Sequence, residues 1–246
     1  MDLQVLTLSS RGGRKVNEDS YGVWSTDRAC YCVVSDGVGG HGGGDTASRL
    51  VVQHALEWFR QHPASAVAED AVRQALEQAN DIVLAEQQSE ERLNHMQATA
   101  VLLAVDTEQR RACWGHLGDS RLYYFHQRQL VTRTRDHSVI QRMVDAGYLP
   151  ASELRTAPER SRLLVAIGAS QHIEPDTATT AEPILPGDTF LLCSDGLWEY
   201  LDEEEIIAIL TSNVGRDSLQ SLESLVRSRG RAGQDNYTAV LVWCEH

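Results

Sequence analysis

Long hydrophobic runs, a basic leader and an excess of positive charge are all missing from this 246-residue sequence. No apolar stretch approaches the roughly 18 residues that a membrane-spanning helix needs, and the first residues, Met1-Asp2-Leu3, are not the basic start of a secretory signal. The formal net charge is −13 at pH 7, and a charge of that sign repels nucleic acid. The sequence therefore predicts no membrane span, no nucleic-acid partner and a cytoplasmic location.

Cysteines are few, and their number is odd. The five cysteines all lie in apolar stretches, at Cys30, Cys32, Cys113, Cys193 and Cys244. This pattern fits reduced thiols in a core better than a disulfide framework. Internal repeats, linkers and low-complexity tracts are also missing, so we expect residues 1–246 to form a single domain.

Hydrophobic periodicity predicts a mixture of strands and helices. Strands are expected at Leu3–Leu8, Tyr21–Trp24, Ala29–Val34, Ala98–Val105, Arg111–Leu117, Arg121–Phe125, Gln129–Thr132, Ile173–Thr180, Thr189–Cys193 and Tyr237–Cys244. The short turns between residues 98 and 132 predict antiparallel pairing of successive strands. Helices are expected from Asp45, a candidate N-cap, to Pro63, and at Val67–Val83, Val139–Ala146, Asp202–Leu210 and Asp217–Arg229.

The stretch from Ala29 to Leu50 joins a buried strand to a helix through Ser35-Asp36-Gly37 and five further glycines. A lone carboxylate at the end of a buried strand is costly unless something pairs with it, and glycines let backbone and ligand approach closely. We therefore expect Asp36 to hold a metal ion at the edge of a sheet.

Carboxylates recur at other predicted strand ends. The Ser-Asp-Gly pattern returns at Asp195, and further acids lie in the turns of Asp119 and Asp235 and in the pair Glu18-Asp19. One Asp-Gly or Asp-Ser pair alone is more typical of a turn than of a ligand, but four such turns in one chain favour ligands. Carboxylates without a neighbouring histidine or cysteine suit hard cations such as Mg²⁺ or Mn²⁺.

A rival interpretation rests on the glycine loop, because Gly37–Gly42 reads G-x-G-x-x-G between a strand and a helix, which is the dinucleotide-binding pattern. Two features count against it. Asp36 would aim a negative charge at the pyrophosphate, and a second helix follows where that fold needs a second parallel strand.

Six short motifs, in this order along the chain, resemble the metal-dependent protein Ser/Thr phosphatases of the PP2C (PPM) family in its compact bacterial form. They are RKVNED from Arg14, SDGVGGH from Ser35, LGDSR from Leu117, RDHS from Arg135, SDGLW from Ser194, and Asp235-Asn236. Each match is weak alone, whereas six collinear matches are specific. The resemblance implies an α+β fold, a four-layer αββα sandwich with two central antiparallel sheets flanked by helix pairs.

Carried over residue by residue, the resemblance implies a centre of two tightly bound Mn²⁺ or Mg²⁺ ions. Asp36 would bridge the two, Asp195 and Asp235 would complete one site, and the backbone carbonyl of Gly37 would serve the other. Two such cations lower the pKa of a shared water and clamp the in-line displacement. The water then attacks phosphorus directly, so that no phosphoenzyme is required.

The remaining implied roles surround this pair. Glu18 and Asp19 would hold metal-bound waters or the second ion, Asp119 would help to bind a third, weaker metal together with Ser161, and Arg14 would grip the substrate phosphate. The implied partners are phosphorylated proteins, including a bacterial Ser/Thr kinase or its targets, and the implied state is a monomer. Tyrosine-phosphatase chemistry is excluded, since no cysteine is followed after five residues by an arginine.

Some positions depart from the family pattern or stay open. Ala157-Pro158 replaces the usual His-Pro, and Gln97-Ala98-Thr99 replaces Gly-Thr-Thr. His41 is either an acid for the leaving group or an exposed loop histidine, and His137 fits a structural hydrogen bond better than catalysis. Residues 136–170 are charged and weakly patterned, which predicts a mobile lid beside the metals. A phosphatase fold kept as a binding module is the competing class, but the complete set of metal carboxylates favours the enzyme.

Overall fold

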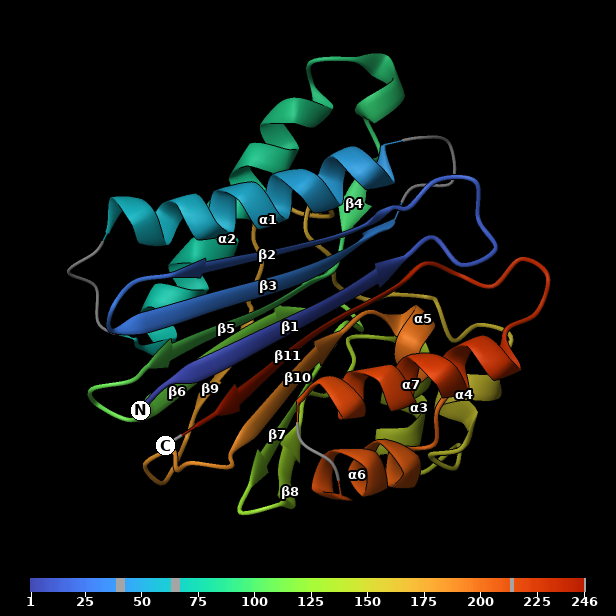
Figure 1. Cartoon of the computed structure of the whole chain (residues 1–246). Coiled ribbons are helices and arrows are strands. Elements are labelled where there is room, and N and C mark those ends of the chain that lie inside the picture. The colour runs from blue at the N-terminus through green and yellow to red at the C-terminus, as the bar shows by residue number, and fades with distance from the viewer. Residues whose placement is uncertain (39–42, 63–66, 213–214, 246) are drawn as a thin grey trace.

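The computed structural model describes residues 1–38, 43–62, 67–212 and 215–245. Its strands form two antiparallel sheets that stack face to face, with helices on both outer faces (Figure 1). The predicted αββα sandwich is therefore confirmed. The two chain ends lie side by side, because the first and last strands pair with Leu3 opposite Cys244.

The first sheet has the order β1-β11-β10-β7-β8. Its strands are β1 (Leu3–Ser10), β11 (Tyr237–Cys244), β10 (Thr189–Cys193), β7 (Arg121–His126) and β8 (Gln129–Arg133). The second sheet has the order β2-β3-β5-β6-β9, with β4 paired to β3. Its strands are β2 (Asp19–Ser25), β3 (Ala29–Val38), β4 (Gln97–Ala98), β5 (Ala100–Asp106), β6 (Arg111–Leu117) and β9 (Asp176–Thr179).

Helices cover each sheet on its outer face. The second sheet carries α1 (Gly44–Gln61) and α2 (Glu69–Gln87), followed by a short 3₁₀ turn at Glu91–Leu93. The first sheet carries α5 (Asp195–Trp198), α6 (Glu203–Ser212) and α7 (Arg216–Arg229). Two short helices, α3 (Val139–Asp145) and α4 (Glu153–Thr156), lie between β8 and β9 in the chain. Within the described ranges, none of these helices is both long and apolar enough to cross a membrane.

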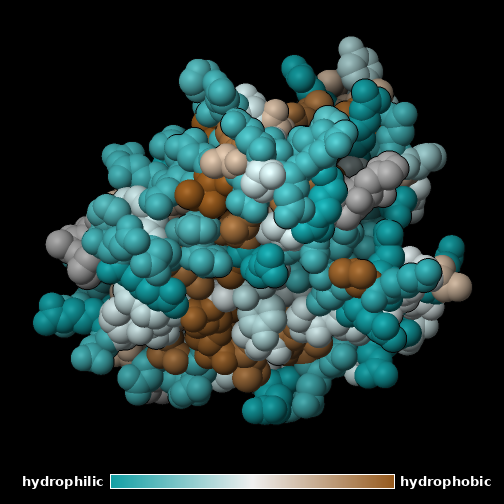
Figure 2. All heavy atoms as spheres, turned by 90° about the horizontal axis from the view of Figure 1, so that it is seen from above, coloured by the Kyte–Doolittle hydropathy of each residue, from teal (hydrophilic) through white to brown (hydrophobic). Residues whose placement is uncertain are grey.

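The hydrophobic pattern of β3 explains the layers. Successive side chains of a strand point to opposite faces, so Cys30, Cys32 and Val34 pack into the core between the sheets, whereas Tyr31 and Val33 pack under α1. A strand buried on both faces reads as a continuous apolar run. The outer surface on the side of α1 is mostly hydrophilic, with hydrophobic side chains gathered in small patches (Figure 2).

Two local predictions were wrong. The strands β6 and β7 do not pair, because the turn at Gly118-Asp119-Ser120 crosses from the second sheet to the first. The side chain of Asp45 does not cap α1, since the N-cap position is Gly43 and Asp45 lies inside the first turn. A carboxylate at that place complements the positive end of the helix dipole instead.

The segment 136–170 is more ordered than its weak pattern suggested. Within it, α3 and α4 share a small hydrophobic cluster formed by Ile140, Leu154 and Ala157, separate from the three main clusters. A backbone bridge of Ser138 with Leu163 joins the two ends of the segment to each other, and a bridge of Ala98 with Ile167 attaches it to the sandwich. Asp136 belongs to the core, because its buried carboxylate pairs with Arg121. The mobility of this segment stays a prediction.

Candidate metal centre

Carboxylates from both sheets converge at the end of the sandwich opposite the chain termini. Asp19 opens β2 and stands directly opposite Asp36 on β3. In the other sheet, Asp195 follows β10 and Asp235 precedes β11. Asp119 lies in the turn that crosses from one sheet to the other. The fold thus brings together acids that lie more than two hundred residues apart in the chain.

The charges of these groups act strongly on one another. Burial raises the pKa of Asp36 well above its ordinary value, and the carboxylates of Asp19, Asp195 and Asp119 raise it further. Burial likewise raises the pKa of Asp195, with added repulsion from Asp119 and Glu199. Buried carboxylates that repel one another need a positive charge to stay ionised near neutral pH.

Asp19 and Asp119 show the same effect. Burial raises the pKa of Asp19 to about 6, although a hydrogen bond from Ser194 lowers it in part. Burial raises the pKa of Asp119 to about 7, with repulsion from Asp136 next and attraction from Arg121 opposing it.

Unpartnered oxygens indicate what this centre fits. The Oδ1 atoms of Asp19 and Asp195 are buried and have no hydrogen-bond partner. A buried carboxylate oxygen without a partner is costly. An all-oxygen set of acids is the ligand set that Mg²⁺ and Mn²⁺ prefer. The residues present therefore fit divalent cations.

Close approach of two backbones explains one glycine of the motif. A Cβ at Gly37 would overlap the carbonyl of Gly44 at the start of α1. Glycine is required here because the end of β3 and the start of α1 lie in contact. The Gly37 amide donates to the carbonyl of Glu18 over 3.1 Å. Whether its own carbonyl binds a metal stays a prediction.

Glu18 lies at the rim of this centre and is partly exposed. Its amide donates to the Asn236 side chain over 2.7 Å, which ties the segment before β2 to the segment before β11. Burial raises the pKa of Glu18, and Asp45 is the next cause. Asp45 thus faces the centre, which its sequence pattern gave no reason to expect.

Arg14 lies beside the acids, but its observed partner is one of them. The guanidinium Nη2 is 2.7 Å from Oδ2 of Asp235, with 53% and 39% of the two side chains exposed. The ion pair places Arg14 at the mouth of the centre. An exposed pair of this kind contributes little stability, so the guanidinium can exchange partners.

Ser161 is exposed, and the neighbouring residue is the one that reaches the site. Arg160 Nε lies 2.6 Å from Oε1 of Glu199, whose side chain is 9% exposed. Glu199 is four residues after Asp195 and raises its pKa. The pair therefore holds the segment around Ser161 next to the converging carboxylates. His41 lies outside the described residues.

Sequence reasoning assigned no role at this centre to Thr99 and Glu199, two residues that connect the acids. Thr99 Oγ1 accepts a hydrogen bond from the Asp36 amide over 2.9 Å and lies 2.7 Å from Ser120 Oγ. Thr99 therefore joins the strand of Asp36 to the turn of Asp119. Glu199 could have been found from its place one helical turn after Asp195, since residues four apart share a helix face.

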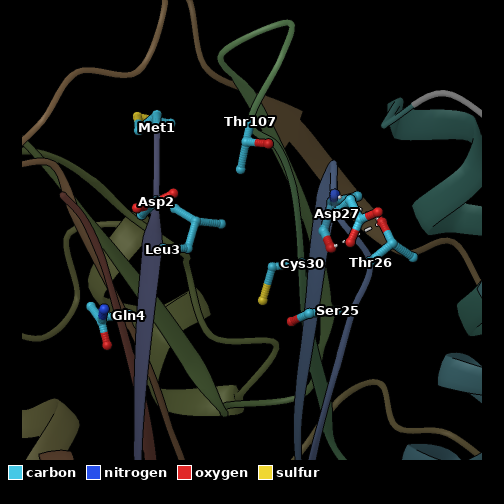
Figure 3. A pocket seen from close by; sticks show the side chains of 10 residues that line it. Met1, Asp2, Leu3, Gln4, Ser25, Thr26, Asp27, Cys30 and Thr107 are labelled. Carbon is cyan, nitrogen blue, oxygen red and sulfur yellow. Dashed lines mark hydrogen bonds between the residues drawn. The ribbon is translucent and has the colours of Figure 1, made fainter. Parts of the chain in front are cut away.

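A separate cavity lies at the opposite end of the sandwich. It has a volume of about 310 Å³ and is lined by Met1, Asp2, Ser25, Cys30 and Thr107, among others. Figure 3 shows these side chains around the space between the start of β1 and the turn from β2 to β3. Because β3 begins beside this cavity and reaches Asp36 only near its other end, the cavity is not part of the metal centre.

Comparison with known proteins agrees with this geometry. The family profile described as "Protein phosphatase 2C" matches residues 9–229. The serine/threonine phosphatase stp of Listeria monocytogenes is 31% identical over 234 residues, which cover 93% of this chain and 90% of that protein.

Solved structures give the same result. The serine/threonine phosphatase PstP/Ppp of Mycobacterium tuberculosis has 30% identity and a TM-score of 0.85, covering 99% of both chains. The catalytic domain of PstP in complex with two manganese ions has 29% identity and a TM-score of 0.82, again over 99% of both chains. The resemblance seen in the six sequence motifs is confirmed, and the chain belongs to the protein phosphatase 2C family.

Proposed function

We propose that this protein is a metal-dependent serine/threonine phosphatase in which the residues placed above carry out hydrolysis of phosphoserine and phosphothreonine. The observation that carries the proposal is the convergence of five buried or half-buried acids from both sheets, two of them with unpartnered buried oxygens. Membership in the protein phosphatase 2C family and the manganese ions in the PstP structure support it.

Asp36 would contribute to two divalent-cation sites. Asp195 and Asp235 would complete one of these sites, and the Gly37 carbonyl would serve the other. Glu18 and Asp19 would hold coordinated waters, and Asp119 with Ser161 would contribute to a weaker third site. When bound, the cations lower the pKa of water and neutralise charge on the phosphoryl oxygens. The mutual repulsion of the acids explains why the metal-free centre favours such ions.

Substrate phosphate would be oriented by Arg14. Its guanidinium can donate two parallel hydrogen bonds to phosphate oxygens, and its pairing with Asp235 already holds it at the mouth of the centre. Asp235 would hold a cation in place of Arg14, which would leave the guanidinium available to the phosphate dianion. The exposed position of Arg14 suits contact with an incoming protein substrate.

Water is the nucleophile that fits the described site. The two serines of the Ser-Asp-Gly motifs are buried and already donate hydrogen bonds, Ser35 to the Thr99 carbonyl over 2.6 Å and Ser194 to Asp19 over 2.7 Å. Neither hydroxyl is available to take up a phosphoryl group. This supports direct hydrolysis without a phosphoenzyme.

The wider setting is part of the same proposal. The substrates are phosphorylated proteins, and we infer a cytoplasmic monomer that opposes a Ser/Thr kinase. One domain over residues 1–246 is supported by the core that the two sheets share. The net charge of −13 suits such a protein because it limits association with nucleic acid.

Phosphate release from a phosphothreonine peptide tests the proposal. The parent protein should release phosphate with Mn²⁺ and stop when EDTA is added, and Asp195→Asn should remove most of the activity while leaving the fold intact by circular dichroism. A parent protein that binds Mn²⁺ and the peptide but releases no phosphate would instead favour the binding-module alternative.

A further inference from the structure

Three side chains form a second polar cluster beside the turn that carries Asp119. They are His116 on β6, His137 after β8, and Asp176 at the start of β9, and each offers a ligand atom within 4.8 Å of the others. His116 and Asp176 stand opposite each other across the strands, and the two imidazole rings stack with centroids 4.6 Å apart. Two histidines and one carboxylate suggest either a transition-metal site or a hydrogen-bonded relay.

Hydrogen bonding to the rings favours the relay. The Gly118 amide donates to Nδ1 of His137 over 3.2 Å, so the ring proton is on Nε2, which lies 3.1 Å from Oδ2 of Asp176. A metal-binding histidine normally donates its other ring N–H to an acceptor. His137 has no N–H left to donate if a metal takes Nε2, so this geometry does not suit a metal.

His137 forms hydrogen bonds with both the amide and the carbonyl of Gly118. Its own amide donates to the Gly118 carbonyl over 2.9 Å, while its ring accepts from the Gly118 amide. Gly118 has φ +95°, and a Cβ there would meet Thr99. The next residue is Asp119, so these two hydrogen bonds fix the backbone from which the Asp119 carboxylate projects.

The same histidine lies near the start of the segment 136–170 and is joined to residues 163–164 of that segment. The Leu164 amide donates to the His137 carbonyl over 2.8 Å, and Ser138 forms a bridge with Leu163. His116, which stacks on the His137 ring, is itself fixed by a hydrogen bond, since its Nε2 lies 2.7 Å from the carbonyl of Arg135. His137 therefore contacts the Asp119 turn on one side, and on the other side Leu164, three residues after Ser161.

We propose that His137, oriented by Asp176 and His116, is a positioning residue that sets the Asp119 carboxylate and connects it to residues 163–164 of the segment 136–170. The proposal rests on the proposed function in so far as Asp119 contributes to a weak metal site. His137 itself touches no reacting atom, and it acts through the Gly118 peptide.

Two substitutions separate the two ring nitrogens. In His137→Asn the side-chain oxygen takes the place of Nδ1 and can still accept from Gly118, whereas in His137→Gln the amide takes the place of Nε2 and keeps only the contact with Asp176. Amide hydrogen exchange at Gly118, measured by NMR on metal-free protein, should stay within about threefold of the parent for His137→Asn. It should rise at least about tenfold for His137→Gln, since a lost hydrogen bond of ordinary strength has that effect.

Activity provides the second readout. The Mn²⁺ concentration for half-maximal phosphate release should rise about five- to tenfold in His137→Gln and stay near the parent value in His137→Asn. His126 is a matched control, because it pairs with Asp188 in a similar way on β7, with Nδ1 and Oδ2 2.8 Å apart. His126→Gln should lower the melting temperature without changing the Mn²⁺ dependence.

Equal exchange rates and equal melting temperatures in the two His137 variants would overturn the proposal and leave only a packing role. Binding of one Zn²⁺ by the parent that is lost in both variants would overturn it in favour of a metal site. Because hydrogen exchange is measured without substrate or metal, a failure of the proposed phosphatase function would leave that result unaffected.

Discussion

Replacing Asp119 by asparagine should stabilise the metal-free protein, and the gain should grow with pH. The Asp119 side chain is 4% exposed, and its pKa is raised from 3.8 to about 7, chiefly by burial. Because the folded state binds this proton more tightly than the unfolded state, the stability that the group contributes is fully present below pH 3.8. It is lost as the pH rises through about 7. The difference between these two pKa values corresponds to about 4 kcal/mol in the free energy of unfolding.

Urea unfolding with EDTA present measures this directly. Between pH 5 and pH 8, the free energy of unfolding of Asp119→Asn should gain about 2 to 3 kcal/mol relative to the parent. The neutral amide keeps the size of the carboxyl group but cannot ionise. Asp70→Asn provides the control, since the Asp70 side chain on α2 is 88% exposed.

Saturating Mn²⁺ should reverse the order of stability, because binding to the folded state adds free energy that depends on the ligand set. A difference between Asp119→Asn and the parent that does not change from pH 5 to pH 8 without metal would refute the reasoning. It would mean that the acids do not repel one another in the folded protein.

Three further predictions follow from other contacts. Arg14→Ala should lower kcat/KM by about ten- to a few-hundredfold, and Arg14→Lys should recover part of this loss. The Mn²⁺ affinity of both variants should change only a few-fold, because the ion pair of Arg14 with Asp235 is exposed. An Arg11→Ala variant as inactive as Arg14→Ala in the same steady-state assay would show that the effect is general electrostatics. Ser161→Ala should change turnover or the Mn²⁺ concentration that turnover needs, while calorimetric binding of the first two ions stays intact; loss of that tight binding would place Ser161 elsewhere in the centre. Asp136→Asn should lower the free energy of unfolding by about 3 to 5 kcal/mol in urea titrations, since it leaves the buried Arg121 guanidinium without its charge partner at 2.6 Å, and a loss below about 1 kcal/mol would contradict this.

Much of the fold could be predicted from the sequence because its strands are buried. The apolar segments of β3, β6, β10 and β11 lie where their patterns placed them, with ends shifted by a few residues at most. Turn length was a poorer guide. The turn at Asp119 is as short as a hairpin but crosses between the sheets, since the choice between pairing and crossing depends on contacts far away in sequence.

The candidate site likewise has a part that the sequence predicts and a part that it does not. The acids at strand ends carry a local signal, a charged residue after an apolar run, and the fold does bring them together. The partners of these acids carry no such signal. That Arg14 would pair with Asp235, or that Glu199 would bind Arg160, follows from residues brought together across the fold. His137 was expected to be a structural hydrogen-bonding residue, but its acceptor role toward Gly118 needed coordinates.

Calorimetric titration of Mn²⁺ into the parent and into Asp36→Asn tests most directly the claim that converging carboxylates form a divalent metal centre. The half-buried Asp36 carboxylate lies next to Asp19 in register and has its pKa raised by burial and by Asp19, Asp195 and Asp119. The parent should bind two Mn²⁺ ions tightly, and Asp36→Asn should lose most of that binding along with its phosphatase activity. Undiminished Mn²⁺ binding by a correctly folded Asp36→Asn would contradict the account.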